Sequence, residues 1–262
     1  MTVTTDKTLL DDVIELADRA GTLILEHYEK GTEARSKADH SPVTDADEAA
    51  EALILPALAK FLPDVPAVAE EAVARSGAPD VGTGRFWLVD PLDGTREFLK
   101  RNGEFTVNIA LIENGLSVLG VVHAPALGLT FAANGAGTAV RKDGNRPFRP
   151  IAARAIPESG AIVVASRSHG NAEALDRFLS EIEVAGLKQA GSSLKFGLLA
   201  SGEADIYPRF GRTMEWDTAA GHAVLAAAGG RVETMDGRPL VYGKPDFANP
   251  EFVAFGKKEP ER

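Results

Sequence analysis

The segment WLVDPLDGTREF, residues 87–98, ends an apolar run with two aspartates and continues at once with a glycine and a threonine. Burial of an unpaired carboxylate is costly, so Asp90 and Asp93 need positive charge beside them if the preceding strand is buried. Pro91 favours an extended backbone, in which both side chains can point to one place and the Leu92 carbonyl stays outside the strand ladder. Two carboxylates and a carbonyl, with no cysteine or histidine beside them, form an oxygen-only site suited to Mg²⁺.

A phosphate site is predicted directly after the two aspartates. Gly94 and Thr95 precede the helix-like stretch REFLKR, and the N–H groups at the start of a helix bind phosphate. Cations and a phosphate site at one place indicate phosphoryl-transfer chemistry, in which positioning and charge neutralisation supply most of the rate.

Other acidic side chains stand at the ends of predicted elements. Glu70 and Glu71 end the strand-like PAVAEE, Asp217 begins an alanine-rich helix, and Asp47 lies three residues after Thr44. Each position has an ordinary explanation: a solvated strand end, a helix N-terminus that favours negative charge, and a capping box. Together with the two aspartates of residues 87–98, however, these side chains favour a shared cation site.

Helical spacing predicts amphipathic helices over residues 6–29 and 45–61, with a kink or break at Pro56. Strand-like segments follow, and then strands and helices alternate, which is typical of a second α/β unit. We therefore expect an α+β part over residues 1–155, with two helices and an antiparallel sheet that carries most metal ligands. Residues 156–262 should form an α/β part that carries Asp217 and the substrate-specificity segments.

Composition excludes several classes of protein. The 262 residues include no cysteine, which rules out disulfides, thiolate zinc sites and a cysteine nucleophile. Residues 114–140 lack Asp, Glu, Lys and Arg, but glycines and a proline divide them into short strand-like runs, so we expect no integral membrane segment. A net charge of −10 argues against binding of a polymeric nucleic acid. We expect a cytoplasmic protein, because no signal-peptide pattern is recognised; peripheral attachment to the inner membrane and oligomeric state are not readable from the sequence.

The acidic motifs resemble those of a known superfamily. EE at 70–71, DPLDGT at 90–95 and WD at 216–217 are similar in kind, order and spacing to the lithium-sensitive, magnesium-dependent phosphatases of the inositol monophosphatase superfamily. Within that superfamily, SRSH at 166–169 and residues 191–224 resemble the bacterial 3'(2'),5'-bisphosphate nucleotidases of the CysQ type. The resemblance covers essentially the whole chain and implies a layered αβαβα sandwich.

The resemblance also implies a set of metal ligands. Glu70, Asp90 and the Leu92 carbonyl would hold the ion that activates water, while Asp90, Asp93 and Asp217 would hold the ion that stabilises the leaving oxygen. Two or three Mg²⁺ ions and inhibition by Li⁺ are expected on the same basis.

The resemblance assigns catalytic roles to three side chains. Thr95, with its hydroxyl oriented by Asp47, and Glu70 would position and deprotonate the attacking water, with no phosphoenzyme. The N–H groups of Gly94 and Thr95 would hold the phosphate that is removed.

A nucleotide with two phosphates needs a second anion site beyond the metals. The residues that we expect to contact substrate are Asp93, Gly94, Thr95, Ser166, His169, Gly191, Ser192, Lys195, Arg209 and Asp217. Simpler explanations exist for some of them: Ser192 as a helix cap, Lys195 as a solvent-facing residue, His169 as a surface histidine, and Arg209 as a partner of Glu215.

The expected reaction is removal of the 3'-phosphate from adenosine 3',5'-bisphosphate, which gives AMP and phosphate and recycles a by-product of sulfate activation. A phosphatase for inositol-1-phosphate or another sugar phosphate would share the same metal ligands. A non-catalytic nucleotide or metal-dependent sensor that kept the pocket is the alternative of a different class.

Overall fold

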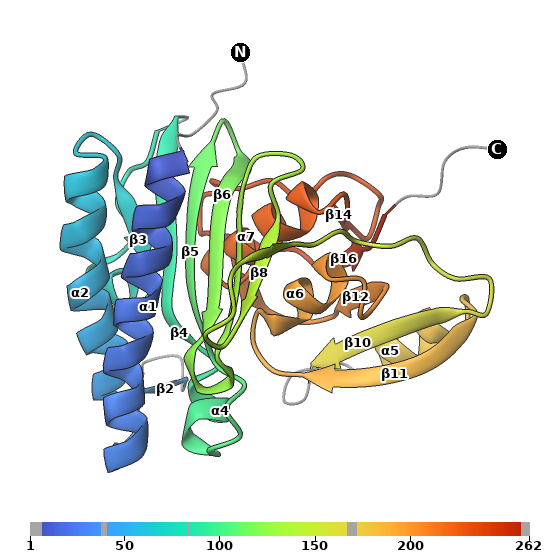
Figure 1. Ribbon diagram of the computed structural model, residues 1–262, viewed down its shortest axis with the longest axis horizontal. Coiled ribbons are helices and arrows are strands. Elements are labelled where there is room, and N and C mark those ends of the chain that lie inside the picture. The colour runs from blue at the N-terminus through green and yellow to red at the C-terminus, as the bar shows by residue number, and fades with distance from the viewer. Residues whose placement is uncertain (1–6, 38–40, 83, 167–171, 258–262) are drawn as a thin grey trace.

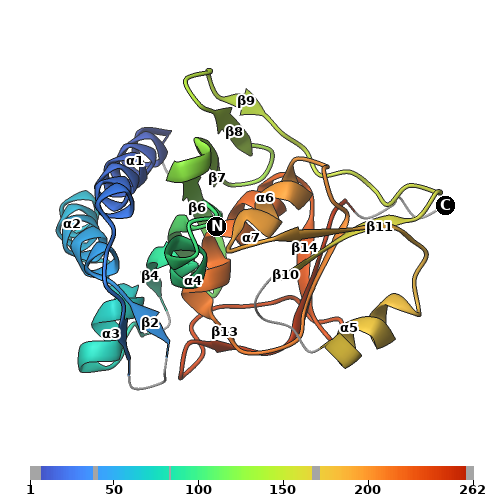
Figure 2. The same cartoon turned by 90° about the horizontal axis from the view of Figure 1, so that it is seen from below.

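A computed structural model describes residues 7–37, 41–82, 84–166 and 172–257. Helices and sheets alternate in layers (Figures 1 and 2). Helices α1 (Lys7–Lys30) and α2 (Asp45–Phe61) cover one face of a seven-stranded sheet, and α6 (Leu194–Ala200) and α7 (Glu215–Ala227) lie between that sheet and a five-stranded one. Helix α5 (Ala172–Leu179) packs on the outer face of the second sheet. The predicted αβαβα sandwich is therefore confirmed.

The first helical layer agrees closely with the predicted ranges. Thr44 caps α2, and Asp47 completes the predicted capping box. Helix α2 continues through Pro56 to Phe61, so the chain does not break at the proline. The apolar faces of both helices pack on the sheet, where Trp87 is fully buried. In the part of the chain that the structure describes, no helix is both long and apolar enough to cross a bilayer.

The first sheet has the strand order β3-β4-β5-β6-β7-β8-β9, and every neighbouring pair is antiparallel except β3 and β4. Its strands are β3 (Ala67–Ala69), β4 (Arg85–Asp93), β5 (Thr106–Glu113), β6 (Leu116–Ala124), β7 (Leu129–Asn134), β8 (Val140–Asp143) and β9 (Arg149–Pro150). Because β3 and β4 run parallel, their carboxyl ends lie at the same edge of the sheet. The short turn η1 (Pro125–Leu127) joins β6 to β7.

One predicted strand end is wrong. Glu70 and Glu71 do not end β3 but begin helix α3 (Glu70–Ser76). The strand is only three residues long, and the acidic pair suits the first turn of a helix because the helix dipole favours negative charge there.

The second sheet has the order β11-β10-β12-β16-β14. Strand β10 is parallel to β11 and β12, whereas β16 is antiparallel to both of its neighbours. The strands are β10 (Ala161–Ser166), β11 (Val184–Ala190), β12 (Ile206–Arg209), β14 (Arg231–Thr234) and β16 (Phe252–Phe255). Two small ribbons complete the fold: β1 (Arg35–Ser36) with β2 (Pro42–Val43), and β13 (Thr213–Met214) with β15 (Ala248–Asn249).

Helix α7 packs between the two sheets. One core cluster contains Phe131 of the first sheet, Phe196 of α6 and Phe252 of the second sheet. Helix α7 lies so close to β6 that a Cβ on Gly120 would come 2.3 Å from the Ala220 carbonyl oxygen. The predicted division near residue 155 stays a prediction, and the two parts meet in this shared core.

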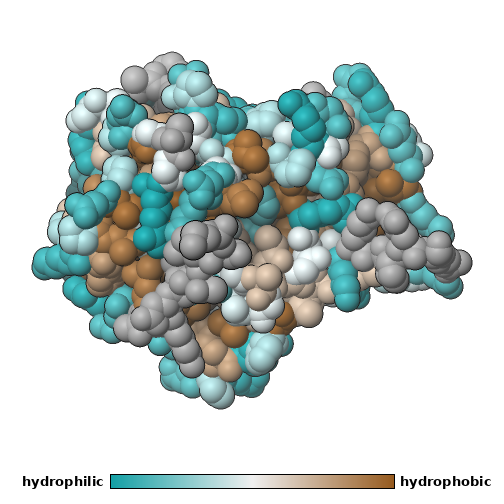
Figure 3. Space-filling view, turned by 90° about the horizontal axis from the view of Figure 1, so that it is seen from above, coloured by the Kyte–Doolittle hydropathy of each residue, from teal (hydrophilic) through white to brown (hydrophobic). Residues whose placement is uncertain are grey.

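The outer surface seen in Figure 3 is hydrophilic in large part, and its apolar side chains lie in small groups separated by polar ones. Exposed apolar side chains such as Leu116 and Val241 contribute to the apolar area that every folded protein leaves in water.

The close contact at Gly120 leads to a stability prediction. Because the added methyl group would meet the α7 backbone, Gly120→Ala should lower the free energy of unfolding by about 1–3 kcal/mol. Gly186→Ala is the matched control, since that glycine also lies in a strand but a Cβ added to it would meet no atom within 4 Å. Urea unfolding of both variants measures the difference, and equal stabilities would contradict this account of the α7 packing.

Candidate active site

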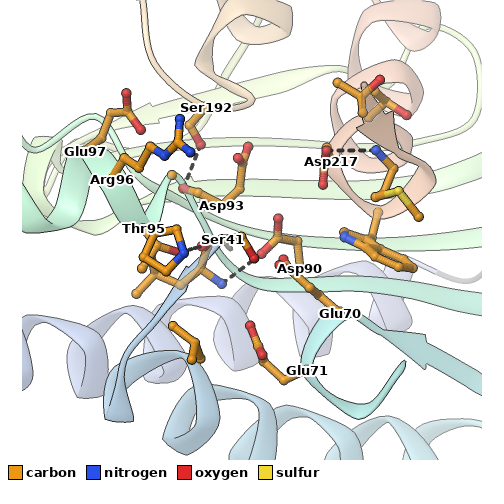
Figure 4. Close-up of a pocket in the computed structure, with 18 of the residues that line it drawn as sticks. Ser41, Glu70, Glu71, Asp90, Asp93, Thr95, Arg96, Glu97, Ser192 and Asp217 are labelled. Carbon is orange, nitrogen blue, oxygen red and sulfur yellow. Dashed lines mark hydrogen bonds between the residues drawn. The ribbon is translucent and has the colours of Figure 1, made fainter. Parts of the chain in front are cut away.

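Three acidic side chains from distant segments meet at the edge of the first sheet. Glu70 begins α3 directly after β3, Asp90 lies near the end of β4, and Asp217 is in the first turn of α7. One carboxylate oxygen from each of these residues lies within 4.8 Å of the other two. Figure 4 shows Asp93 beside them, with Thr95 and Ser192 close by. The structure thus brings together the side chains expected to bind cations.

A bulge in β4 shapes this edge. Asp90 pairs with Asn108 of β5 and Asp93 pairs with Thr106, so one extra residue of β4 is accommodated between them. Leu92 lies in this bulge, outside the regular register, and its N–H donates to Asp90 Oδ1 at 3.0 Å. A β-bulge redirects the side chains around it, and here it turns both aspartates toward the pocket.

Hydrogen bonds also hold Asp217 and the neighbouring Asp93. Asp217 Oδ2 accepts from the Met214 N–H at 2.9 Å. Asp93 Oδ2 accepts from Ser193 Oγ at 2.9 Å and from Asn108 Nδ2 at 3.3 Å. Because one oxygen of each carboxylate is held by the protein, the orientation of the other oxygen is set as well.

The carboxylates oppose one another's ionisation. Burial raises the pKa of Asp90 well above its usual range, and the neighbouring carboxylates raise it further. The pKa of Asp217 is raised for the same two reasons. Close-set carboxylate oxygens with raised pKa values fit a hard divalent cation, because such an ion supplies the positive charge that the cluster needs.

Lys37 is a cation of this cluster that the sequence did not reveal. Its Nζ lies 2.6 Å from Glu70 Oε1 and 2.6 Å from Glu71 Oε1. Burial opposes the charge of Lys37, but the two glutamates outweigh it and its pKa is raised. Burial raises the pKa of Glu71 to about 7, against the opposing effect of the lysine. No local motif marks Lys37, since its partners lie 33 and 34 residues further along the chain.

Asp47 accepts hydrogen bonds from two residues, Thr44 and Thr95. Its Oδ2 accepts from the Thr44 N–H at 2.8 Å and from the Thr44 hydroxyl at 2.7 Å, which forms the capping box. Its Oδ1 accepts from Thr95 Oγ1 at 3.0 Å. The capping explanation and the orientation of Thr95 are therefore both present in the structure.

The turn before Thr95 requires glycine. Gly94 has φ 92°, in the left-handed region, and precedes helix α4 (Thr95–Leu99). A Cβ there would lie 3.3 Å from the Glu104 carbonyl oxygen. The glycine thus allows β4 to turn sharply into α4 beside the carboxylates.

These residues line a pocket of about 680 Å³. Most of the predicted site residues lie on its wall, namely Glu70, Asp90, Leu92, Asp93, Gly94, Thr95, Ser166, Ser192, Lys195, Arg209 and Asp217. Gly191 does not line it, and its N–H donates to Glu104 Oε2 at 2.8 Å. His169 lies outside the described residues.

Lys195 is buried rather than solvent-facing, with 4% of its surface exposed. Its Nζ donates to the Ser192 carbonyl at 2.5 Å and to the Ala190 carbonyl at 3.3 Å, and lies 5.2 Å from the centre of the Tyr207 ring. Burial lowers the pKa of Lys195 to about 8, and the positive charge of Arg209 acts in the same direction. A buried ammonium group on a pocket wall is a strong candidate for anion binding.

Two serines connect this lysine to the carboxylates. Ser192 Oγ donates to the Asp93 carbonyl at 2.9 Å instead of capping α6. Ser193 Oγ lies within hydrogen-bond distance of both Asp93 Oδ2 and the Asp217 carbonyl, and accepts from Asn108 Nδ2 at 2.8 Å. Ser193 and Asn108 were missed because their partner Asp93 is 100 and 15 residues away and no spacing rule links them.

The chain matches the inositol monophosphatase family over residues 6–259. It is 46% identical over 247 residues to the 3'(2'),5'-bisphosphate nucleotidase CysQ of Escherichia coli (strain K12), which covers 93% of this chain and 98% of that relative. The nucleotidase CysQ of Haemophilus influenzae is 31% identical, over 97% of this chain and 95% of its own length.

Solved structures agree with these sequence matches. The crystal structure of CysQ from Bacteroides thetaiotaomicron, a bacterial member of the same family, has a TM-score of 0.79 and 36% identity over 97% of this chain and 98% of that one. The Thermotoga maritima IMPase has a TM-score of 0.73 and 26% identity, covering 94% of this chain and 91% of its own.

The repulsion within the cluster leads to a prediction about cations and pH. The raised pKa values of Asp90 and Asp217 mean that the folded protein keeps protons that the unfolded chain has released. Its stability in EDTA should therefore fall as the pH rises above the ordinary carboxyl pKa of about 4, until the pH passes the raised pKa values of the folded protein. Addition of Mg²⁺ at about 100 times its Kd should restore about 2.7 kcal/mol near pH 8.

The neutral variant Asp90→Asn tests whether the Asp90 carboxylate causes this dependence of stability on pH and Mg²⁺. Without divalent ions near neutral pH it should be more stable than the natural protein by about 1–4 kcal/mol, because an amide at this position needs neither a buried negative charge nor the uptake of a proton on folding. It should gain little from Mg²⁺. Thermal unfolding in EDTA and in Mg²⁺ measures both effects, and a Mg²⁺ response as large as that of the natural protein would contradict the assigned cation site.

Proposed function

This chain belongs to the inositol monophosphatase family, and on that premise we propose that it is a magnesium-dependent 3'(2'),5'-bisphosphate nucleotidase. It hydrolyses the 3'-phosphate of adenosine 3',5'-bisphosphate and gives AMP and inorganic phosphate. The nucleotidase names of its relatives support this substrate.

The proposal is supported by two separate groups of charged side chains on the wall of one pocket, each of which we assign to one phosphate of the substrate. The carboxylate cluster with Gly94 and Thr95 occupies one region, and buried Lys195 with Arg209 lies in the other. A substrate with one phosphate needs only the first region. A substrate with two phosphates needs both, because a second buried phosphate must have its own cation.

The proposed ligand set for the ions is the one that the family resemblance implies, and the meeting of Glu70, Asp90 and Asp217 supports it. Glu70, Asp90 and the Leu92 carbonyl would hold one Mg²⁺, and Asp90, Asp93 and Asp217 would hold another, with a total of two or three ions. When bound, the ions lower the pKa of a water molecule and neutralise charge on the phosphate oxygens. Li⁺ is expected to inhibit by competing for one of these positions.

The side chains of the protein then orient the reacting groups. The Thr95 hydroxyl donates a hydrogen bond to Asp47, so its oxygen lone pairs are available to accept a hydrogen bond from the attacking water and position it. Glu70 lies at the same edge of the pocket and accepts the proton that the water loses. The N–H groups of Gly94 and Thr95 bind the departing phosphate, and no covalent phosphoenzyme forms.

In the cell, this activity would recycle a by-product of sulfate activation, and we place it in the cytoplasm. The net charge of −10 is unfavourable for a polymeric nucleic acid, and the local cations of the pocket suit a small anionic nucleotide.

A substrate panel tests the proposal. Phosphate release with Mg²⁺ is compared for adenosine 3',5'-bisphosphate, AMP, inositol-1-phosphate and fructose-1,6-bisphosphate. We expect kcat/KM for the adenosine bisphosphate to exceed those for AMP and inositol-1-phosphate by at least about 100-fold, since these two compounds have no second phosphate to bind the buried ammonium group of Lys195. Fructose-1,6-bisphosphate, which has two phosphates, tests whether the nucleoside is also required. Equal rates with inositol-1-phosphate would identify a sugar-phosphate phosphatase, and no release from any compound would favour a sensor.

Lys195→Met tests the second anion region separately. It keeps a long apolar stem and removes the charge, so KM for adenosine 3',5'-bisphosphate should rise about 10- to 100-fold. Hydrolysis of inositol-1-phosphate, where it is measurable, should change less than about threefold. An equal loss on both substrates would mean that Lys195 supports the common metal site and not the second phosphate.

A further inference from the structure

Helix α3 has no cap of its own. It begins at Glu70, and the residue at its N-cap position is Ala69, which has no side-chain acceptor. The first-turn N–H groups of a helix have no partner within the helix and need an acceptor from elsewhere. A helix of seven residues is also too short to be stable alone, so its position depends on its contacts.

Glu51 of the neighbouring helix α2 supplies that acceptor. Its Oε2 accepts from the Glu71 N–H at 2.9 Å and from the Ala72 N–H at 3.0 Å. These are the second and third residues of α3, whose N–H groups a serine or aspartate N-cap would normally bind. Glu51 is 1% exposed, so water does not replace it readily. Its other oxygen, Oε1, accepts from Arg75 Nη2 at 2.5 Å in the last turn of α3.

The capped turn carries Glu70, whose carboxylate belongs to the cation cluster with Asp90 and Asp217. Because Glu70 is the first residue of α3, rotation or fraying of that turn would move its side chain relative to the other two carboxylates. Misplacement by about 1 Å can cost about 100-fold in rate. The separation of Glu70 from its partners therefore depends on what holds the first turn.

We propose that Glu51 is a positioning residue that holds Glu70 at the cation cluster by capping α3 from α2. The expected effect of this capping on turnover rests on the proposed function. Its expected effects on the α3 N–H groups and on cation binding do not depend on that function. The alternative is that Glu51 serves stability alone, as a buried acid paired with Arg75.

Glu51→Met is the primary variant, since it keeps the volume and the apolar stem and removes the acceptor. We expect kcat at saturating substrate and Mg²⁺ to fall about 10- to 100-fold, and half-activation by Mg²⁺ to need a several-fold higher concentration. KM for the nucleotide should change less than about threefold, because Glu51 does not face the second anion region. Hydrogen exchange at the Glu71 and Ala72 amides should become faster.

Two variants separate capping from other roles. Glu51→Gln keeps an oxygen acceptor without the charge and should retain kcat within about threefold. Ala69→Ser in the Glu51→Met background places a cap in the same chain, where Ala69 already has extended N-cap geometry with φ −123° and ψ 143°. This second change should restore most of the turnover and the slow exchange of the two amides.

Glu113→Ala is the matched control. Glu113 is also a buried acid paired with an arginine, Arg85 at 2.5 Å, but it ends β5 away from the carboxylate cluster. We expect it to lower the melting temperature and leave kcat within about twofold. A Glu51→Met protein that is folded at the assay temperature and keeps its kcat and Mg²⁺ response within about twofold would overturn the proposal.

Two further outcomes are decisive. If Glu51→Met does not fold, a loss of kcat greater than about 30-fold in folded Glu51→Gln would overturn the capping role, and retention would support it. If the natural protein turns over no compound of the panel, the proposed function fails, while amide exchange and the Mg²⁺-induced shift in melting temperature still decide the role of Glu51.

Discussion

Mutual repulsion among buried Asp90 and the half-buried Glu70 and Asp217 is the constraint on which the arrangement of the site depends. Asp90 and Asp217 resist ionisation because each is enclosed and faces other negative charges. Such a cluster forms only if other parts of the chain hold it in place, and here these parts are the first sheet and helix α7. The parallel pairing of β3 with β4 brings two strand ends together, the bulge turns β4 inward, and α7 delivers its first turn from the opposite side.

Local rules predicted the elements that depend on local sequence. DPLDGT contains a proline that extends the backbone and a glycine that accepts φ 92°, so the end of the strand and the following turn could be predicted from adjacent residues, whereas the bulge was not predicted. The helices over residues 7–30 and 45–61 follow from periodicity and from the Thr44 cap. The layered stacking came from family resemblance, because periodicity alone does not specify which faces meet.

Contacts between distant segments could not be predicted. The contacts of Lys37 with Glu70 and Glu71, and of Ser193 with Asp93, join segments that are adjacent only in the packed fold. The start of α3 was misassigned for the same reason, since its cap belongs to α2 and leaves no signature beside Glu70. The solvent-facing alternative for Lys195 was wrong because the helical pattern of LKFGLLA does not show that α6 is enclosed between two sheets.

The two carboxylate oxygens of Asp47 have different roles, and this restricts which substitutions the position can accept. One oxygen takes part in the cap of helix α2, and the other accepts a hydrogen bond from the Thr95 hydroxyl on the pocket wall. A substitution of Asp47 that improved the start of helix α2 would also remove or alter the hydrogen bond from the Thr95 hydroxyl. Helix stability and the orientation of Thr95 are therefore coupled through one side chain, and a substitution of Asp47 cannot change one without affecting the other.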